Sequence, residues 1–306
     1  MKTSPINNIV AGVGNTPLVR LYNLEKALKW EGQIWAKNEF LNQTGSFKDR
    51  GSITEIKAAI TQGKKGVVCA STGNMAASLS SYAAKNKMLC VVVVPKNTPE
   101  GKLKQARICG AKIISIDGTY DDCVDKAKEY ALENNFLLCG DYELRRIGQS
   151  TVGLELAQSD VSFDSFIVPV GNGTLGCAIS QGFAMVGKFP SFIGVQGEGS
   201  DPVYKTWKEK RSNIKPLQKP STIASAMKVG NPLDGNLTLE WINRTSGEMI
   251  SVSDKEIQGA QNLLAEEEGI YVEKSAAATV AALNKLNNKN SNMVLILTGN
   301  GLKEGS

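Results

Sequence analysis

Short apolar runs alternate with longer amphipathic segments along most of the chain. Runs rich in valine and isoleucine at residues 66–70, 88–95 and 112–117 predict buried strands. Each run precedes a longer amphipathic segment, and the predicted helices span residues 73–86, 98–109 and 120–134. Alternation of this kind favours a parallel sheet with helices on both faces.

The same pattern resumes in the second half of the chain, where residues 165–170, 192–196 and 293–297 are predicted strands beside helical segments. We therefore predict an α/β fold with two open, twisted, mostly parallel sheets. The chain is expected to cross from the first sheet to the second within residues 139–148. Ligands of open α/β sheets bind at the carboxyl ends of the strands, so the glycine-rich loops there are where a site is expected.

Composition limits the function. The 306 residues are 42% hydrophobic and 21% charged, with a net charge of +5, as in soluble globular proteins with a sizeable core. No run of lysine and arginine resembles a nucleic-acid arm, so no nucleic-acid partner is expected. The longest strongly apolar run, residues 88–94, is too short to cross a bilayer, and residues 1–5 lack the apolar core of a signal peptide. We expect a cytoplasmic protein without membrane association.

The chain has six cysteines, no Cys-x-x-Cys pair and no histidine. The cysteines are expected to be buried, reduced thiols, and no metal site is expected. The lack of histidine excludes a Ser–His or Cys–His hydrolase. A general base near neutral pH must therefore be a lysine, a carboxylate, a tyrosine or a cysteine.

One lysine occupies an unusual place. In Asn42-Gln-Thr-Gly-Ser-Phe-Lys-Asp-Arg-Gly51, a Gly-Ser turn brings Lys48 to the start of a helix predicted for residues 47–62. The helix dipole there opposes a positive charge, which favours the neutral amine that a Schiff base requires. On this segment alone, a solvated lysine in a first helical turn is the alternative.

Three further segments place polar residues or glycines after a predicted strand. Ser71-Thr-Gly-Asn-Met-Ala-Ala-Ser78 offers backbone N–H groups and hydroxyls to an anion such as a carboxylate, or is an ordinary helix cap. Gly171-Asn-Gly-Thr-Leu-Gly176 lets the backbone approach a phosphate, and it also fits a dinucleotide motif with Glu198 near the ribose-binding position. Leu297-Thr-Gly-Asn-Gly-Leu302 offers a hydroxyl to a heterocycle nitrogen, or is a simple terminal turn.

Together and in this order, these segments resemble the fold-type II enzymes that depend on pyridoxal 5′-phosphate (PLP). Gly14-Asn-Thr-Pro-Leu-Val-Arg-Leu21 is similar to the opening segment of that family, whereas a dehydrogenase would leave the other three segments unexplained. Within the family, the chain most resembles the threonine synthases. The segments that carry this resemblance are residues 71–78, 142–151, 268–273 and 298–303.

The resemblance covers nearly the whole chain and implies its architecture. The cofactor would lie between a smaller, mobile domain at residues 40–145 and a larger PLP-binding domain made of residues 1–39 and 146–306. A homodimer is the expectation for this family.

The resemblance also implies roles in binding PLP. Lys48 would be the Schiff-base lysine and proton shuttle, Phe47 would pack near the ring, and Asn74 would hydrogen-bond the 3-oxygen. Thr298 would face the pyridine nitrogen. The cofactor phosphate would be held by Gly171, Asn172, Gly173 and Thr174.

On the substrate side, Ser71, Thr72 and Asn74 would receive the carboxylate. A guanidinium grips a phosphate at two points, so Arg145 is the candidate for the substrate phosphate and Arg146 is its rival. The implied lyase reaction converts O-phosphohomoserine and water to threonine and phosphate by β,γ-replacement. Three alternatives stay open: a β-replacing cysteate or cysteine synthase that uses phosphoserine, a threonine or serine dehydratase, and a non-catalytic or nucleotide-binding relative.

Overall fold

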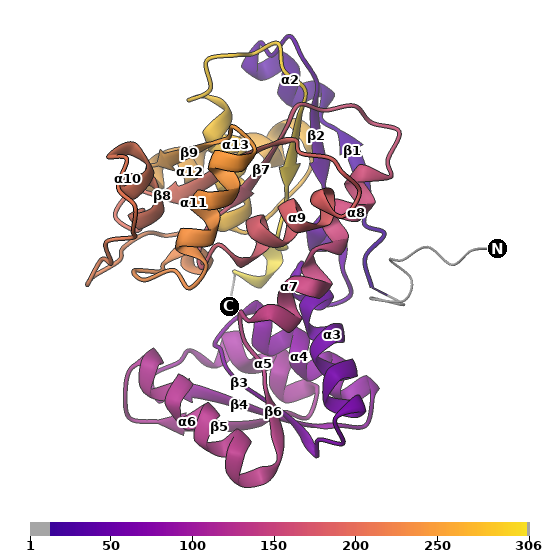
Figure 1. The fold of residues 1–306 in the computed structure, drawn as a ribbon, viewed down its shortest axis with the longest axis vertical. Coiled ribbons are helices and arrows are strands. Elements are labelled where there is room, and N and C mark those ends of the chain that lie inside the picture. The colour runs from indigo at the N-terminus through magenta and orange to yellow at the C-terminus, as the bar shows by residue number, and fades with distance from the viewer. Residues whose placement is uncertain (1–12, 305–306) are drawn as a thin grey trace, which may run out of the picture. The chain divides into compact units, whose positions relative to one another are not determined.

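The computed structural model describes residues 13–304, which divide into two compact units. Unit 1 contains residues 13–14 and 42–151, and unit 2 contains residues 15–41 and 152–304. Each unit is built around one mainly parallel sheet with helices packed on it (Figure 1). The predicted α/β class with two mostly parallel sheets is therefore confirmed.

Unit 1 has a four-stranded sheet in the order β5-β4-β3-β6, and all of its strands are parallel. The strands are β3 (Gly66–Ala70), β4 (Leu89–Pro95), β5 (Lys112–Ile116) and β6 (Phe136–Leu138). The helices are α3 (Lys48–Thr61), α4 (Asn74–Lys85), α5 (Glu100–Ile108), α6 (Tyr120–Asn134) and α7 (Glu143–Gln149).

The strand order of unit 1 creates a switch point. From β3 the chain moves outward through β4 to β5, and it then returns across the sheet through α6 to place β6 on the other side of β3. The loops after β3 and after β6 therefore leave neighbouring strand ends toward different helices. In open α/β sheets, ligands bind outside the carboxyl ends of the strands at such a switch point.

Unit 2 has a six-stranded sheet in the order β1-β2-β10-β7-β8-β9, in which only the β1–β2 pair is antiparallel. Its strands are β1 (Leu18–Arg20), β2 (Ile34–Lys37), β7 (Ser165–Pro169), β8 (Ser191–Gly197), β9 (Glu248–Val252) and β10 (Met293–Ile296). Its helices are α2 (Tyr22–Leu28), α9 (Thr174–Ala184), α10 (Pro202–Lys208), α11 (Gly235–Arg244), α12 (Asp254–Glu268) and α13 (Lys274–Leu283). Helix α8 (Thr151–Ala157) lies at the boundary between the two units in the sequence. Short 3-10 turns are η1 (Glu39–Leu41), η2 (Ser225–Met227) and η3 (Gly301–Lys303).

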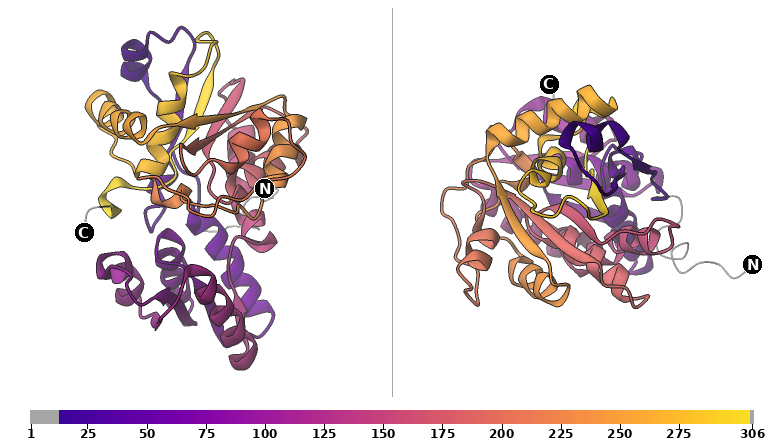
Figure 2. Two further views of the ribbon diagram at one scale, coloured as in Figure 1. Left: turned by 90° about the vertical axis from the view of Figure 1, so that its left-hand side faces the viewer. Right: turned by 90° about the horizontal axis from the view of Figure 1, so that it is seen from above.

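Helices cover the unit 2 sheet on both faces (Figures 1 and 2). Helix α13 packs on β7, β8, β9 and β10, and α12 packs against α13. Helices α9, α10 and α11 pack on β7, β8 and β9 from the other side. Because both faces are covered, the central strands are apolar along their whole length, as β10 illustrates with four buried residues in a row.

Helix α12 begins with a capping box. The Ser253 hydroxyl accepts a hydrogen bond from the backbone N–H of Glu256 at 3.3 Å, and the Glu256 carboxylate accepts one from the backbone N–H of Ser253 at 2.6 Å. Ser253→Ala is expected to lower the free energy of unfolding by about 1 kcal/mol, because an N–H of the first turn loses its acceptor. Urea denaturation beside Ser162→Ala, a change of an exposed loop serine, measures this effect. Equal stability of the two variants would contradict it.

Within residues 13–304, no helix is both long enough and apolar enough to cross a membrane.

Candidate active site

Lys48 is the first residue of α3, one residue after the predicted helix start. Its Nζ donates to Asp141 Oδ1 at 3.1 Å and lies 4.9 Å from the centroid of the Phe47 ring. The Lys48 side chain is 19% exposed, and its amine is paired with Asp141. Phe47, predicted to pack near a PLP ring, therefore lies beside the predicted Schiff-base lysine within unit 1.

Asp141 is a candidate site residue that the sequence analysis did not single out. It follows β6 in the loop at the carboxyl end of the strand, on the switch-point side of β3. The available signal was the Gly140-Asp141 turn inside the predicted crossing segment, and the pairing with a lysine 93 positions earlier becomes visible only in the fold.

Arg145 has its partners inside unit 1. Its guanidinium is fully buried, and Nη2 forms an ion pair with the buried Glu55 carboxylate of α3. Nε donates to the Gly140 carbonyl at 3.1 Å, and Nη1 donates to the Lys48 carbonyl at 3.3 Å. The neighbouring side chain of Arg146 is partly exposed. Sequence analysis also missed Glu55, because a glutamate within an amphipathic helix normally faces solvent.

Burial raises the pKa of Glu55 from its usual 4.5 to about 7, and the nearby charge of Asp141 adds to this rise. The charge of Arg145 and the hydrogen bond from the Gly140 N–H act in the opposite direction, to lower the pKa. The folded chain therefore retains a proton on Glu55 between these pH values that the unfolded chain releases. Stability must then fall as the pH rises through this window, because the unfolded state binds fewer protons there.

Glu55→Gln is expected to make the free energy of unfolding depend less on pH between 4.5 and 7. The contribution of Glu55 to the slope is roughly 1 kcal/mol per pH unit, since a single proton is involved. Urea denaturation at intervals from pH 4.5 to 7 measures it, with Glu133→Gln, a change of an exposed α6 carboxylate, as control. A wild-type slope that persists unchanged in Glu55→Gln would contradict the assignment.

The turn after β3 carries the predicted carboxylate-binding residues. Ser71, Thr72 and Asn74 are all partly exposed, and Asn74 is the first residue of α4. The Ser71 hydroxyl accepts a long hydrogen bond from the Gly73 N–H at 3.3 Å. Because a helix N-terminus presents N–H groups without intrahelical partners, this turn is suited to binding an anion.

In unit 2, the predicted phosphate loop connects β7 to α9. Asn172 anchors it, since its carbonyl accepts from the Asp234 N–H at 2.8 Å. Gly173 caps α9 with a φ of 90°, a conformation that favours glycine, and a Cβ there would collide with the Thr238 hydroxyl. Gly171 is similarly packed against the carbonyl of Ala226. The glycines therefore allow close packing and the turn into α9.

Thr174 provides the test of whether this loop fits a phosphate. It is the first residue of α9, and its buried Oγ1 has no hydrogen-bond partner among residues 13–304. Buried hydroxyls without a partner are rare in native proteins. A phosphate oxygen at this helix N-terminus would satisfy the Thr174 hydroxyl together with the N–H groups of the first turn, so the loop fits the phosphate of PLP.

Thr298 follows β10, which pairs in parallel with β7. The loops after these strands therefore leave the same edge of the unit 2 sheet, and Thr298 lies on the same side as the phosphate loop. Its side chain is largely buried. The adjacent Gly299 lies against the Glu273 carboxylate, where a Cβ would collide, and Glu273 N–H donates to the Gly299 carbonyl at 2.9 Å. Segment 298–299 is thus held firmly.

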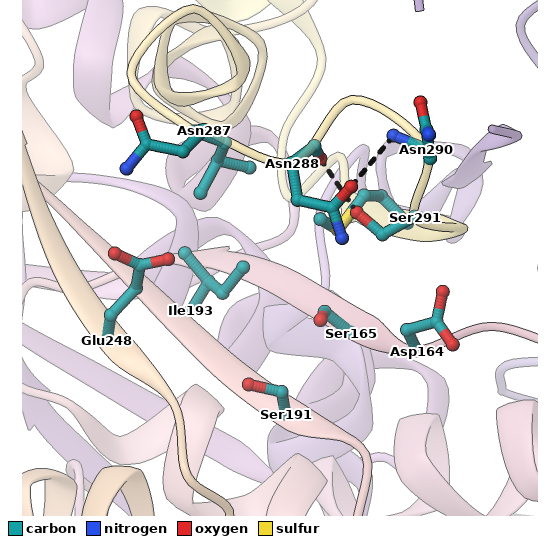
Figure 3. A pocket seen from close by; sticks show the side chains of 11 residues that line it. Asp164, Ser165, Ser191, Ile193, Glu248, Asn287, Asn288, Asn290 and Ser291 are labelled. Atoms are coloured by element: carbon teal, nitrogen blue, oxygen red, sulfur yellow. Dashed lines mark hydrogen bonds between the residues drawn. The ribbon is translucent and has the colours of Figure 1, made fainter. Parts of the chain in front are cut away.

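A cavity of about 450 Å³ lies at the opposite edge of the unit 2 sheet, where β7, β8, β9 and β10 begin (Figure 3). Its lining carries the carboxylates of Asp164 and Glu248 with several asparagines and serines, and the described lining includes no lysine or arginine. Figure 3 shows Glu248 near Ile193, at the other end of the lining from Asp164. This chemistry does not suit a phosphate, so the cavity is not the candidate cofactor site.

Comparison with known proteins agrees with the interpretation of the loops as a PLP site. Residues 9–299 match the family described as "Pyridoxal-phosphate dependent enzyme". The chain is 38% identical to threonine synthase of Methanocaldococcus jannaschii over 95% of its own length and 75% of that protein. It is 36% identical to threonine synthase of a Bacillus species, over 95% of its length and 84% of the relative.

Among solved structures, maize serine racemase matches with a TM-score of 0.87 at 24% identity, covering 97% of this chain and 91% of the racemase. At that identity the match shows the fold alone. The family match and the threonine synthase relatives extend over nearly the whole chain, and the candidate loops lie at strand ends in both units. The chain therefore belongs to the pyridoxal-phosphate-dependent enzyme family, in its threonine synthase branch.

Proposed function

We propose that this protein is a PLP-dependent threonine synthase that converts O-phosphohomoserine and water to threonine and inorganic phosphate. The observation that carries the proposal is the similarity to threonine synthases over 95% of the chain. The place of Lys48 at the start of α3, with a partly exposed side chain, supports it.

We assign PLP binding to the residues that the family resemblance implies. Lys48 would bind it covalently, with Phe47 against its ring and Asn74 at its 3-oxygen. Thr298 would accept or donate a hydrogen bond at the pyridine nitrogen. The phosphate would be bound by Gly171, Asn172, Gly173 and Thr174, and the buried Thr174 hydroxyl is the feature that supports this assignment.

Bound PLP supplies an electron sink for negative charge that develops on the substrate. The chain itself moves the protons, and Lys48 Nζ is the group we assign to proton transfer at Cα and Cβ. Ser71, Thr72 and Asn74 would hold the substrate carboxylate through hydroxyls and helix N–H groups. Across the whole reaction, the Cγ–O bond to phosphate and one Cβ–H bond break, Cγ gains a proton, the hydroxyl from water is attached at Cβ, and the other proton of water leaves with the phosphate.

The substrate phosphate needs a cationic partner, and the chain offers two adjacent arginines. Arg145, the candidate from the sequence, is buried and paired with Glu55, so a phosphate would have to displace that carboxylate. Arg146 is partly exposed. We therefore propose Arg146 as the first arginine to test, and the role of Arg145 in phosphate binding stays a prediction.

The Glu55–Arg145 pair also favours one second candidate function. An enzyme whose substrate carries no phosphate has no need of a free guanidinium, and a threonine or serine dehydratase is such an enzyme. This candidate uses the same cofactor and the same lysine. It differs from the first in the product, which is a keto acid and ammonia.

A panel of four substrates separates these functions. PLP-loaded protein is incubated with O-phosphohomoserine, O-phosphoserine, threonine and serine, and phosphate, amino acids and keto acids are measured. Threonine and phosphate in equal amounts from O-phosphohomoserine support threonine synthase. Keto acid from threonine or serine, without phosphate release from O-phosphohomoserine, would contradict it and favour a dehydratase.

We also propose that the protein acts in the cytoplasm as a homodimer, following the family resemblance. A monomeric mass in light scattering would contradict the dimer. Absence from the cytosolic fraction of the source cells would contradict the location.

A further inference from the structure

Two acidic and two basic side chains join α3 to the segment that follows β6 in unit 1. We propose that Glu55, Arg145 and Asp141 are positioning residues that hold the Lys48 amine in place for the cofactor. The inference rests on the proposed function in so far as Lys48 is taken as the lysine that bears PLP.

Arg145 acts on the backbone of Lys48. Its Nη1 donates to the Lys48 carbonyl at 3.3 Å, which ties the first turn of α3 to α7. Its Nη2 pairs with Glu55, which lies seven residues further along the same helix. One guanidinium therefore grips α3 at two points, and the position of Lys48 depends on it.

The same guanidinium holds the segment that carries Asp141. Arg145 Nε donates to the Gly140 carbonyl at 3.1 Å and lies 4.0 Å from Asp141 Oδ1. Glu55 closes the arrangement, because its other oxygen accepts from the Gly140 N–H at 3.1 Å. The segment is thus fixed through both its N–H and its carbonyl, and Asp141 reaches Lys48 Nζ at 3.1 Å from this fixed base.

The network leaves the guanidinium with little freedom. Each of the three nitrogens of Arg145 has an acceptor, and the side chain is fully buried. Gly51 makes room for it, since a Cβ at that position would lie 2.5 Å from Arg145 Cγ. A lysine in place of Arg145 keeps the charge but lacks the planar fork, so it would not hold α3 and Gly140 at once.

Charge balance gives Asp141 a specific task. Lys48 and Arg145 share Asp141 as a neighbouring anion, since its Oδ1 lies 3.1 Å from Lys48 Nζ and 4.0 Å from Arg145 Nε. Without the Asp141 carboxylate, the Lys48 amine loses the acceptor and the counter-ion that lie beside it. The amine would then move away from its present position.

The test uses Asp141→Asn and Arg145→Lys, with Asp121→Asn as the control for an exposed acid of the same unit. For each protein we would measure the dissociation constant of PLP from cofactor-stripped enzyme, the visible circular dichroism of bound PLP, and kcat and KM. Both variants are expected to bind PLP more weakly and to lose kcat by on the order of 10- to 100-fold, as expected for a misplaced group. We expect altered circular dichroism and an unchanged KM.

Unchanged PLP affinity and circular dichroism with a raised KM in Arg145→Lys would overturn the proposal, because that pattern belongs to an arginine that binds the substrate phosphate. If Arg145→Lys fails to fold, the test rests on PLP affinity and circular dichroism of Asp141→Asn. This variant is expected to fold, because the Asp141 side chain is partly exposed. Failure of the proposed function looks different. If wild-type protein carries PLP on Lys48 but releases no phosphate, the PLP affinities of the variants still test the positioning role. If borohydride reduction and mass spectrometry find no PLP on Lys48, both the proposed function and the positioning role are overturned.

Discussion

Lys48→Ala is expected to lower the rate of phosphate release from O-phosphohomoserine by at least about 10³-fold. The variant loses both the amine that binds PLP covalently and the group that transfers protons, and each of these contributions is large by itself. The measurement is phosphate release under single-turnover conditions, combined with mass spectrometry of the borohydride-reduced protein to find PLP on the chain.

The control for this prediction is Lys104→Ala, which removes an exposed lysine from α5 of the same unit. It is expected to keep full activity and a PLP-modified Lys48. A Lys48→Ala variant that retains more than about a tenth of the wild-type rate would show that another group performs the chemistry, since general acid–base catalysis alone accounts for more than that.

Gly173→Ala is expected to lower the free energy of unfolding by about 2–4 kcal/mol and to weaken PLP binding. Two costs combine at this position. The φ of 90° is strained for alanine, and the new Cβ would collide with the Thr238 hydroxyl and approach the Asp234 carbonyl to 3.0 Å. Relief of these contacts would shift the N-terminus of α9 and with it the Thr174 hydroxyl. Urea denaturation and PLP titration measure the two effects.

Gly187→Ala is the matched control in unit 2. Gly187 also has a positive φ, at 71°, but a Cβ there would meet nothing within 4 Å. Its replacement should cost only the backbone strain, about 1 kcal/mol, and should leave PLP affinity unchanged. If Gly173→Ala is no more damaging than Gly187→Ala, the phosphate loop does not depend on the close packing described here.

Most of the strands that the sequence predicted are buried, as β3, β4 and β10 show, whereas β5 was predicted although it lies at the edge of its sheet and has no fully buried residue. In β4 (Leu89–Pro95), four consecutive valines leave no other interpretation, and in β3 (Gly66–Ala70) the observed bounds equal the predicted ones. The strands that were missed carry a weaker signal. β6 is a three-residue Phe-Leu-Leu run, β2 is a four-residue Ile-Trp-Ala-Lys run, β9 begins with Glu248, and β1 is a short edge strand, so none shows a long apolar run.

The candidate site residues also differ in how clearly the sequence indicates them. Asn74, the phosphate loop and Thr298 were singled out because turns at strand ends need glycine and small polar residues, and Lys48 because a Gly-Ser turn brings it to a helix start. Their roles stay predictions. Glu55 and Asp141 were not found, because their roles depend on partners far along the chain. The pair of Glu55 with Arg145 spans 90 positions and gives no periodic signal.

The most direct test of threonine synthase activity is to run the reaction of O-phosphohomoserine in water labelled with oxygen-18. Cleavage of the Cγ–O bond and addition of water at Cβ predict one labelled oxygen in the hydroxyl of threonine and unlabelled phosphate. Labelled phosphate accompanied by homoserine would show cleavage of the P–O bond instead. That result would contradict the assignment of this chain as a carbon–oxygen lyase.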